Sequence, residues 1–223
     1  MNYNFRFNAL APYIGDIVDG VALTLQLTCL TMAIALVIGL LVALARLGHN
    51  RFLSGAATAY VEAIRNTPLL VQLFIVFFGL PAIGIRLDAS LAALVGLSIN
   101  VGAYVGEILR AGIQSVRTSQ VEAGRALGMT AAQTFRNVVL FPAVKAVYPA
   151  LASQFVLLLL ATSVVSSIGV AELFHQASFI DSRTYRSFEA YALITVTYLV
   201  LTLGFRAVFS LVYWLVFVRR RRA

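Results

Sequence analysis

The sequence predicts an all-α integral membrane protein with five transmembrane helices. Hydrophobic residues make up 61% of the 223 residues and charged residues only 12%, with a mean hydropathy of +0.90. Soluble domains are usually about half apolar and about a quarter charged. In addition, the apolar residues form long uninterrupted runs, and the basic residues gather on one predicted side of the membrane. A soluble fold is therefore not expected.

Five apolar runs contain no charged residue: 21–45, 68–85, 89–106, 146–171 and 190–205. Crossing the hydrocarbon core takes roughly 20 residues of helix. Four runs meet that length directly, and the last does so when it continues past Arg206. We predict a single transmembrane domain over residues 1–223, with spans at about 20–46, 54–80, 88–110, 145–169 and 188–217.

The net charge of +8 is interpreted as a topology signal. Lys and Arg in short loops mark the cytoplasmic side of a membrane protein. With five spans, one face holds Arg6, Arg86, Arg183, Arg186 and most of the acidic residues. The other face collects most of the basic residues: Arg46, Arg51, Arg110, Arg117, Arg125, Arg136, Lys145 and Arg219–Arg222. We therefore predict an outer N-terminus, a cytoplasmic C-terminus and the lipid bilayer, rather than nucleic acid, as the partner of the basic chain.

The number and positions of the cysteine and histidine residues indicate no disulfide and no metal site. Cys29 is the single cysteine, so the chain cannot form an internal disulfide. His49 and His175 lie on opposite predicted faces, which leaves no cluster with metal-ligand spacing. We expect no metal and no catalytic residue in this chain.

The cytoplasmic segment at about 118–141 is the most informative stretch. Ser119 with Glu122, and Thr130 with Gln133, have the spacing of capping boxes that begin helices. Gly128 can end the first helix in the left-handed conformation. We predict two short helices joined at Gly128 and Met129, before Pro142 interrupts the chain. Such a preformed helix pair suits a docking partner, and an ordinary surface helix is the alternative.

The same segment resembles the EAA loop of ABC importer permeases. The resemblance rests on Glu122-Ala123-Gly124, then Gly128, then Phe141-Pro142; Gly124 stands where Ala is usual and Phe141 where Leu is usual. It implies the type I importer permease fold with a coupling helix that docks in a groove of a separate ATPase subunit. The residues that it assigns to ATPase coupling are Glu122, Ala123, Gly124, Leu127, Gly128 and Pro142.

Three further stretches are similar to polar amino acid permeases of the histidine, glutamine and arginine type: 60–81, 98–112 and 166–173. This resemblance implies the permease subunit of an amino acid importer in the bacterial cytoplasmic membrane. It also implies an ATPase dimer, a second permease subunit (identical or homologous) and an extracytoplasmic binding protein. Lys145, the only lysine, follows Val144, so the chain has no P-loop. We expect no cofactor here, with ATP and Mg²⁺ bound by the partner ATPase.

Polar residues inside spans are energetically costly and are therefore candidates for the transport pathway. Glu62 and Arg65 are three residues apart and are expected to form a structural ion pair on one helix face. Pro68 is expected to kink the second span. The expected pathway residues are Asn66, Thr67, Asn100, Tyr104, Thr162 and Ser163. Packing contacts are expected at Gly39, Gly96, Gly102 and Gly106.

One departure from the family bears on the substrate. Many members have Lys-Asp before the Thr-Ser of the fourth span, where this chain has Leu160 and Ala161. We hypothesise that this chain does not bind a basic side chain through that carboxylate. It would instead pair with a chain that carries the site, or serve a neutral or acidic amino acid. A secondary transporter or channel remains the alternative function, and a membrane enzyme is less consistent with two distant histidines.

Overall fold

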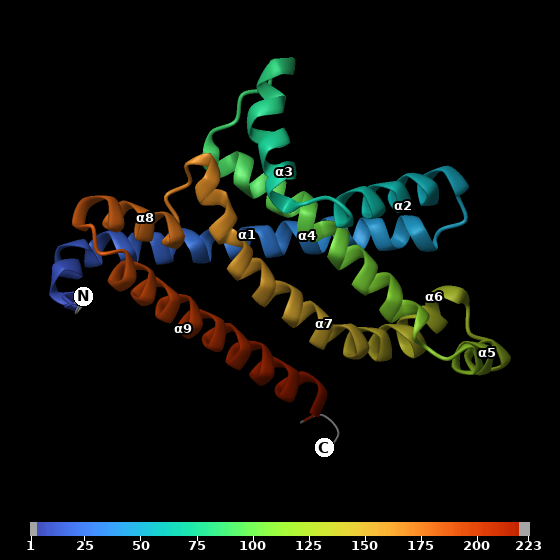
Figure 1. The fold of residues 1–223 in the computed structure, drawn as a ribbon. Helices are drawn as coiled ribbons and strands as arrows, with labels where there is room; N and C mark the ends of the chain where they lie inside the picture. Colours follow the sequence, from blue (N-terminus) through green and yellow to red (C-terminus); the bar gives the residue numbers. More distant parts are fainter. Residues whose placement is uncertain (1–3, 219–223) are drawn as a thin grey trace. The chain divides into compact units, whose positions relative to one another are not determined.

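A computed structural model describes residues 4–218, and helices account for all the regular secondary structure of this part of the chain (Figure 1). The first half of the chain contains η1 (Phe7–Tyr13), α1 (Ile14–Leu47), α2 (Arg51–Arg65), α3 (Leu69–Phe74), η2 (Ile75–Gly79), η3 (Leu80–Ile83) and α4 (Ala89–Gln114). The second half contains α5 (Thr118–Ala126), α6 (Ala131–Thr134), η4 (Phe135–Val139), α7 (Leu140–Ala161), η5 (Thr162–Ile168), α8 (Leu173–Thr184), α9 (Ser187–Tyr213) and η6 (Trp214–Val218). Arg219–Arg222, which contribute to the predicted charge asymmetry, lie outside the described residues.

Four helical stretches of the described chain are long and apolar enough to cross a membrane: Phe7–Leu47, Ala89–Gln114, Ala131–Ile168 and Ser187–Val218. A broken helix pair, Arg51–Arg65 and Leu69–Ile83, makes a fifth if the two helices count as one span.

The expected kink at Pro68 is a complete break. Helix α2 stops at Arg65 and α3 resumes at Leu69. Proline lacks an N–H and disfavours the helical conformation of the residue before it, so the helix cannot continue through Thr67. The Thr67 hydroxyl donates to the carbonyl of Ala63 (2.8 Å), which satisfies one of the free carbonyls at the end of α2.

The chain divides into two compact units, and each is described by itself. The first comprises the described part of Met1–Met32 with Pro68–Leu97 and Val156–Val208. Its core joins the N-terminal segment, α8 and the start of α9 through Leu10, Ile17, Leu173, Ala177, Ile180, Ala190 and Ile194. In this unit Gly96 lies against Leu73: a Cβ on Gly96 would come within 2.7 Å of a methyl group of that leucine.

The second unit comprises Ala33–Thr67, Ser98–Phe155 and the described part of Phe209–Ala223. Helices α1 and α4 approach closely here, since a Cβ on Gly102 would lie 2.6 Å from Ile38 and one on Gly106 2.7 Å from Val42. Gly39 faces Val105 in the same interface. The predicted packing role of the span glycines is confirmed, because small residues let helix backbones approach within a membrane.

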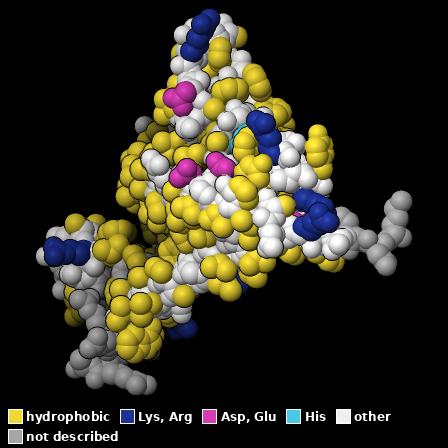
Figure 2. Space-filling view, turned by 90° about the vertical axis from the view of Figure 1, so that its left-hand side faces the viewer, with side chains coloured by type: hydrophobic (Ala, Val, Ile, Leu, Met, Phe, Trp, Pro, Cys, Tyr) yellow, Lys and Arg dark blue, Asp and Glu magenta, His cyan; other side chains and the backbone are white. Residues whose placement is uncertain are grey.

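Large apolar side chains are widely exposed, as helices that face lipid require. Helix α9 exposes Val196, Leu199, Val200, Leu203, Val208 and Leu211, each by more than half of its surface. Hydrophobic side chains also cover much of the face shown in Figure 2, where charged side chains are few. Soluble monomers rarely expose apolar patches of this extent.

Candidate functional site

The segment that we predicted to couple to a partner forms a helical hairpin in the second unit. Helix α5 ends at Ala126, and Gly128 adopts the left-handed conformation (φ +76°). The Gly128 N–H donates to the carbonyl of Arg125 (2.9 Å), and the Met129 N–H donates to that of Gly124 (3.2 Å). These two bonds form a Schellman motif, which glycine permits without a steric penalty. The predicted turn at Gly128 and Met129 is confirmed.

The start of each hairpin helix shows how far spacing alone predicts a cap. The Thr130 hydroxyl accepts from the Gln133 N–H (3.3 Å) and the Gln133 side chain accepts from the Thr130 N–H (2.9 Å), which confirms that capping box. The box at Ser119 is wrong. Arg117 has the extended backbone of an N-cap, and α5 begins at Thr118 with no side-chain cap among the described residues. Ser119 therefore lies within the first turn.

Pro142 does not interrupt the chain, contrary to our expectation. The helical stretch continues from α6 through the π-helical segment η4 into α7, with Pro142 in the first turn of α7. A proline removes one backbone hydrogen bond. The π-helical segment η4 ends just before Pro142. Its wider turn changes the hydrogen-bond pattern next to the position where proline, which has no N–H, cannot form an α-helical bond.

A groove of about 390 Å³ runs between α5 and the helical stretch that follows it. The groove is lined by Gln120, Ala123, Gly124, Leu127, Met129, Asn137, Val138 and Pro142. Four of the expected coupling residues thus line one concave surface, whereas Glu122 is exposed on α5 and Gly128 forms the turn. Leu127, at the end of α5, is 77% exposed, so the lining of the groove includes a largely exposed apolar side chain.

Gly124 explains a departure from the family pattern. A Cβ at this position would lie 3.2 Å from a methyl group of Thr134 and 3.4 Å from one of Val138. Contacts this short require the neighbours to shift, so the close approach of α5 to the following helix favours glycine over the usual alanine.

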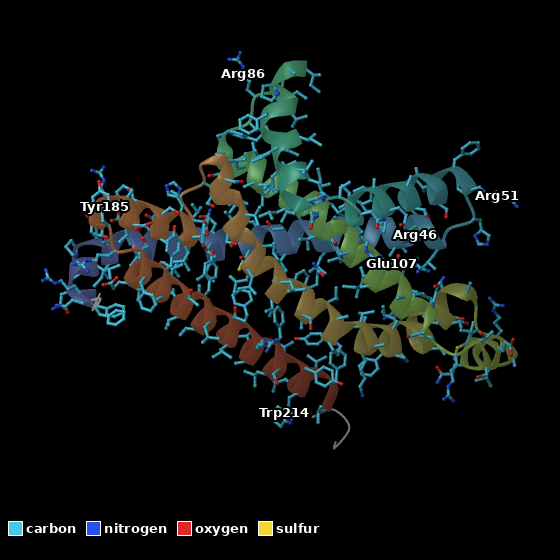
Figure 3. The ribbon with its side chains drawn as sticks, viewed as in Figure 1. Arg46, Arg51, Arg86, Glu107, Tyr185 and Trp214 are labelled. Carbon is cyan, nitrogen blue, oxygen red and sulfur yellow. The ribbon has the colours of Figure 1, made fainter. Side chains whose placement is uncertain are left out.

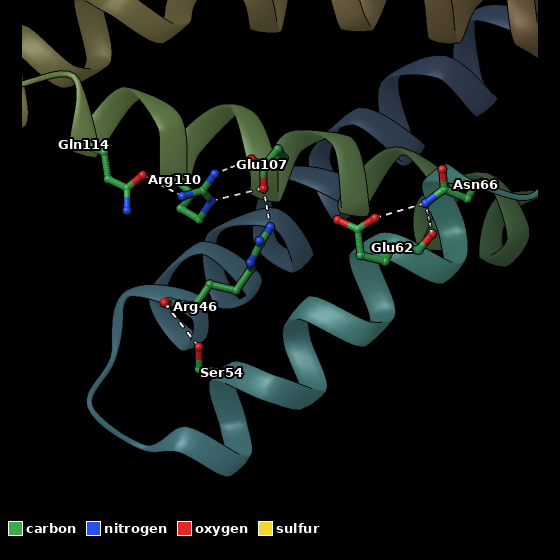
Figure 4. A network of polar contacts seen from close by, with 7 residues as sticks. All are labelled: Arg46, Ser54, Glu62, Asn66, Glu107, Arg110 and Gln114. Carbon is green, nitrogen blue, oxygen red and sulfur yellow. Dashed lines mark hydrogen bonds and ion pairs between the residues drawn. The ribbon is translucent and has the colours of Figure 1, made fainter.

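A cluster of charged residues joins α1 to α4 in the second unit (Figures 3 and 4). The Glu107 carboxylate accepts hydrogen bonds from Arg46 and from two nitrogens of Arg110, and Arg110 also donates to the Gln114 side chain (2.5 Å). The side chains of Glu107 and Arg46 are only 22% and 14% exposed. One carboxylate therefore holds two guanidinium groups from different helices, a geometry typical of a structural anchor.

The expected ion pair between Glu62 and Arg65 is not among the ion pairs of residues 4–218. The Asn66 side-chain amide donates to the Glu62 carboxylate (3.0 Å) and to the Glu62 carbonyl (2.8 Å), as Figure 4 shows. The guanidinium carbon of Arg65 lies 5.4 Å from the centre of the Tyr104 ring. Glu62 and Arg65 thus have different neighbours, and both are exposed.

With this geometry established, the chain can be compared with known proteins. Residues 35–218 match the protein family described as the binding-protein-dependent transport system inner membrane component. The chain belongs to this family. As an ABC importer permease it is a multi-pass inner membrane protein, and ATP hydrolysis belongs to a partner subunit.

Individual relatives match most of the permease. A probable glutamine ABC transporter permease protein of Bacillus subtilis (strain 168) is 38% identical over 203 residues, which cover 91% of this chain and 92% of that relative. An L-cystine transport system permease protein of the same organism is 44% identical over 164 residues, or 74% of this chain and 70% of that relative. The solved structure of an amino acid ABC transporter with histidines is similar, with a TM-score of 0.90 and 41% identity over 95% of this chain and 99% of that chain. These similarities confirm the predicted permease fold.

The expected pathway residues of the permease belong to both units. Asn66, Thr67, Asn100 and Tyr104 lie in the second unit, while Thr162 and Ser163 lie in the first. Within the second unit, Asn66 is brought together with Glu62 and Tyr104 with Arg65. Asn100 is buried and Thr67 is exposed.

The hydroxyl groups of the fourth apolar run bind their own helix. Thr162 donates to the carbonyl of Leu159 and Ser163 to that of Leu160, both at 2.7 Å, at the start of the 3₁₀ segment η5. Serine and threonine commonly bond back to the preceding turn. Thr162 is fully buried and Ser163 is half-buried. The bond occupies the Ser163 hydroxyl proton, so a solute at Ser163 would meet the hydroxyl oxygen as an acceptor.

Sequence reasoning missed a buried carboxylate in the first unit. Glu172 is fully buried and caps α8, accepting the N–H groups of Phe174 (2.8 Å) and His175 (2.9 Å). The Tyr198 hydroxyl also donates to it (2.7 Å). Burial raises the pKa of the Glu172 carboxyl, while these hydrogen bonds oppose that rise. Glutamate is not among the residues preferred at N-caps, so the sequence signals neither the cap of α8 nor the contact with α9.

Proposed function

We propose that this permease moves a polar amino acid across the cytoplasmic membrane in a complex with an ATPase dimer, a second permease subunit and an extracytoplasmic binding protein. The second permease subunit is identical or homologous, and the ATPase subunits hold ATP and Mg²⁺. The printed names of the relatives, which refer to glutamine, L-cystine and histidine, support the amino acid class.

The topology is part of the same proposal. The permease has five spans within one domain, and the broken pair α2 and α3 forms the second span. The N-terminus lies outside and the C-terminus in the cytoplasm. In this orientation the hairpin segment between the third and fourth spans is cytoplasmic, which fits its basic residues Arg117, Arg125 and Arg136.

The grooved hairpin is the observation that carries this function. Both ends of its turn are fixed by local hydrogen bonds, at Gly128 and at Thr130, and the exposed Leu127 lines the groove. A rigid hairpin with an exposed apolar side chain and a concave surface is suited to bind a partner subunit whose motion it transmits. ATP binding would move the ATPase subunits and the hairpin together, and this motion would alternate access to the pathway.

Two matched glycines test this coupling in proteoliposomes that contain the permease complex and its binding protein. A Cβ at Gly128 or at Gly55 would meet no heavy atom of residues 4–218 within 4 Å, but only Gly128 has a positive φ. We expect Gly128→Ala to strain the turn by about 1 kcal/mol and to lower uptake per ATP hydrolysed. Gly55→Ala should leave that ratio unchanged. Uptake that continues without ATP would instead identify a secondary transporter or channel.

The substrate's charge can be tested at Ala161. We propose that the permease serves a neutral or acidic amino acid, or that its partner chain carries a cation-binding carboxylate, because Leu160 and Ala161 replace the Lys-Asp of many relatives. Ala161→Asp should raise uptake of arginine relative to glutamine. An unchanged selectivity would refute this assignment.

A further inference from the structure

Glu62 and Arg65 are charged side chains of α2 that form no direct ion pair within the described part of the permease, and Arg65 interacts with the Glu107 carboxylate of α4 only at longer range. Both side chains are exposed on α2, within the predicted second span, and neither has an ion-pair partner among residues 4–218. Charged groups in a span are costly and occur where they face water, a partner charge or a ligand. Their exposure therefore indicates a place that a charged molecule can reach.

Each of the two charged groups lies beside a neutral side chain. The Arg65 guanidinium lies over the Tyr104 ring, with its carbon 5.4 Å from the ring centre, which is within the range of a cation–π interaction. Its N–H edge remains suited to a planar anion. The Asn66 amide donates to one Glu62 oxygen at 3.0 Å, which fixes the carboxylate while leaving it able to accept further hydrogen bonds.

The spacing of the two groups fits one small molecule with two opposite charges. Residues three apart on a helix have Cβ atoms roughly 5–6 Å apart on the same face. A guanidinium binds a carboxylate through two parallel hydrogen bonds, and a carboxylate accepts bonds from an ammonium group. A free amino acid carries both partners on a single carbon, whereas a simple cation or anion would satisfy only one of the two residues.

We propose that Arg65 and Glu62 form a subsite that binds the α-carboxylate and the α-ammonium of the transported amino acid, respectively. This inference rests on the proposed function and deepens it. Such a subsite recognises what all free amino acids share, so it leaves discrimination between side chains to other residues. Tyr104 acts as a positioning residue that holds the guanidinium.

Equilibrium binding to the permease–ATPase complex without binding protein tests this subsite directly. The complex is placed in nanodiscs of phosphatidylcholine and phosphatidylglycerol, whose headgroups carry no primary ammonium. Labelled glutamine, cystine and histidine are assayed, and the tightest ligand is displaced by its decarboxylated amine and by its deaminated acid. The wild-type complex should bind each analogue at least about tenfold more weakly than the parent, as expected for a lost charged hydrogen bond.

The two variants should show reciprocal patterns. Arg65→Gln should weaken the parent at least about tenfold and abolish the preference over the decarboxylated amine, while keeping the preference over the deaminated acid. Glu62→Gln should do the reverse. Tyr104→Leu should change the affinities in the same pattern as Arg65→Gln, but by only about two- to fivefold. Tyr104→Phe keeps the aromatic ring and should therefore keep wild-type affinity. Arg51→Gln, at the exposed start of the same helix, is the matched control and should change nothing.

Three outcomes would overturn the subsite. Variants that weaken the parent and both analogues by the same factor would indicate a general structural role. Wild-type affinity in both Gln variants would show that neither charge contacts the ligand. Recovery of binding by the exchange of the two residues, Glu62→Arg with Arg65→Glu, would identify an intrahelical ion pair. If the wild-type complex binds none of the three amino acids, nor labelled glutamate as an acidic one, the proposed substrate class itself fails.

Discussion

Glu107 on α4 and Glu62 on α2 are two carboxylates of the same unit with opposite surroundings. Glu107 accepts hydrogen bonds from Arg46 and Arg110 and is 22% exposed, whereas Glu62 is exposed and accepts only the amide of Asn66 among side-chain donors of the described residues. A charge in a span helix can therefore serve either stability or ligand binding, depending on the partners that surround it.

The position of Arg46 makes the difference. Arg46 lies in the last turn of α1, where a cation is favourable, and its carbonyl accepts a bond from the Ser54 hydroxyl of α2 (3.4 Å). The chain between these helices is fixed by Asn50, whose side chain accepts the N–H groups of Phe52 (3.0 Å) and Leu53 (3.2 Å). Arg46 is therefore presented to Glu107 by a short, ordered connection.

The largest loss of stability should come from Glu107→Gln. Removing this charge leaves the partly buried guanidinium groups of Arg46 and Arg110 without a counter-ion, which should lower the free energy of unfolding by about 2 kcal/mol. Denaturant titration of the purified permease in detergent measures the change. A loss below about 0.5 kcal/mol would mean that the cluster does not anchor α1 to α4.

Arg46→Gln should lower the free energy of unfolding by about 1 kcal/mol, which is half the loss expected for Glu107→Gln. The link between α1 and α4 is lost, but Glu107 keeps its two hydrogen bonds from Arg110 on the same helix. The same titration measures it, with Arg51→Gln as an exposed control on the neighbouring helix. A loss as large as that of Glu107→Gln would show that Arg110 contributes nothing.

The sequence predicted the features whose partners are close in the chain. The apolar runs predicted the long helices, and the caps at Gly128 and Thr130 were predictable because their partners lie within five residues. Glu62 and Arg65 are also close enough in sequence to form an ion pair. However, Tyr104 from another helix lies beside the Arg65 guanidinium and competes for it. Spacing cannot reveal such a competitor.

Long-range polar contacts were the part that the sequence could not predict. Arg46 is 61 residues from Glu107, and Tyr198 is 26 residues from Glu172. Helix packing, set by small residues such as Gly102 at the interface of α1 and α4, decides which polar side chains meet. Helix packing depends on the complementary shapes of helix surfaces, and no short sequence motif encodes that complementarity.

A smaller effect is expected at Ser54. Its hydroxyl bond to the Arg46 carbonyl is long, at 3.4 Å, and Ser54→Ala should lower the free energy of unfolding by at most about 0.5 kcal/mol. If the loss instead approaches that of Arg46→Gln, the connection between α1 and α2, rather than the ion pair, positions Arg46.

Glu62→Gln should have the smallest effect on stability, because the side chain is exposed and the glutamine can still accept from Asn66. We expect the free energy of unfolding to stay within about 0.5 kcal/mol of wild type, while ATP-driven amino acid uptake in proteoliposomes falls at least about tenfold. The same chemical change at Glu107 should give the opposite result, a stability loss with uptake retained wherever the protein remains folded. If both variants lose stability equally, Glu62 is an anchor like Glu107. If Glu62→Gln changes neither property, its charge is a solvated surface charge, and ligand binding must be sought elsewhere in the permease.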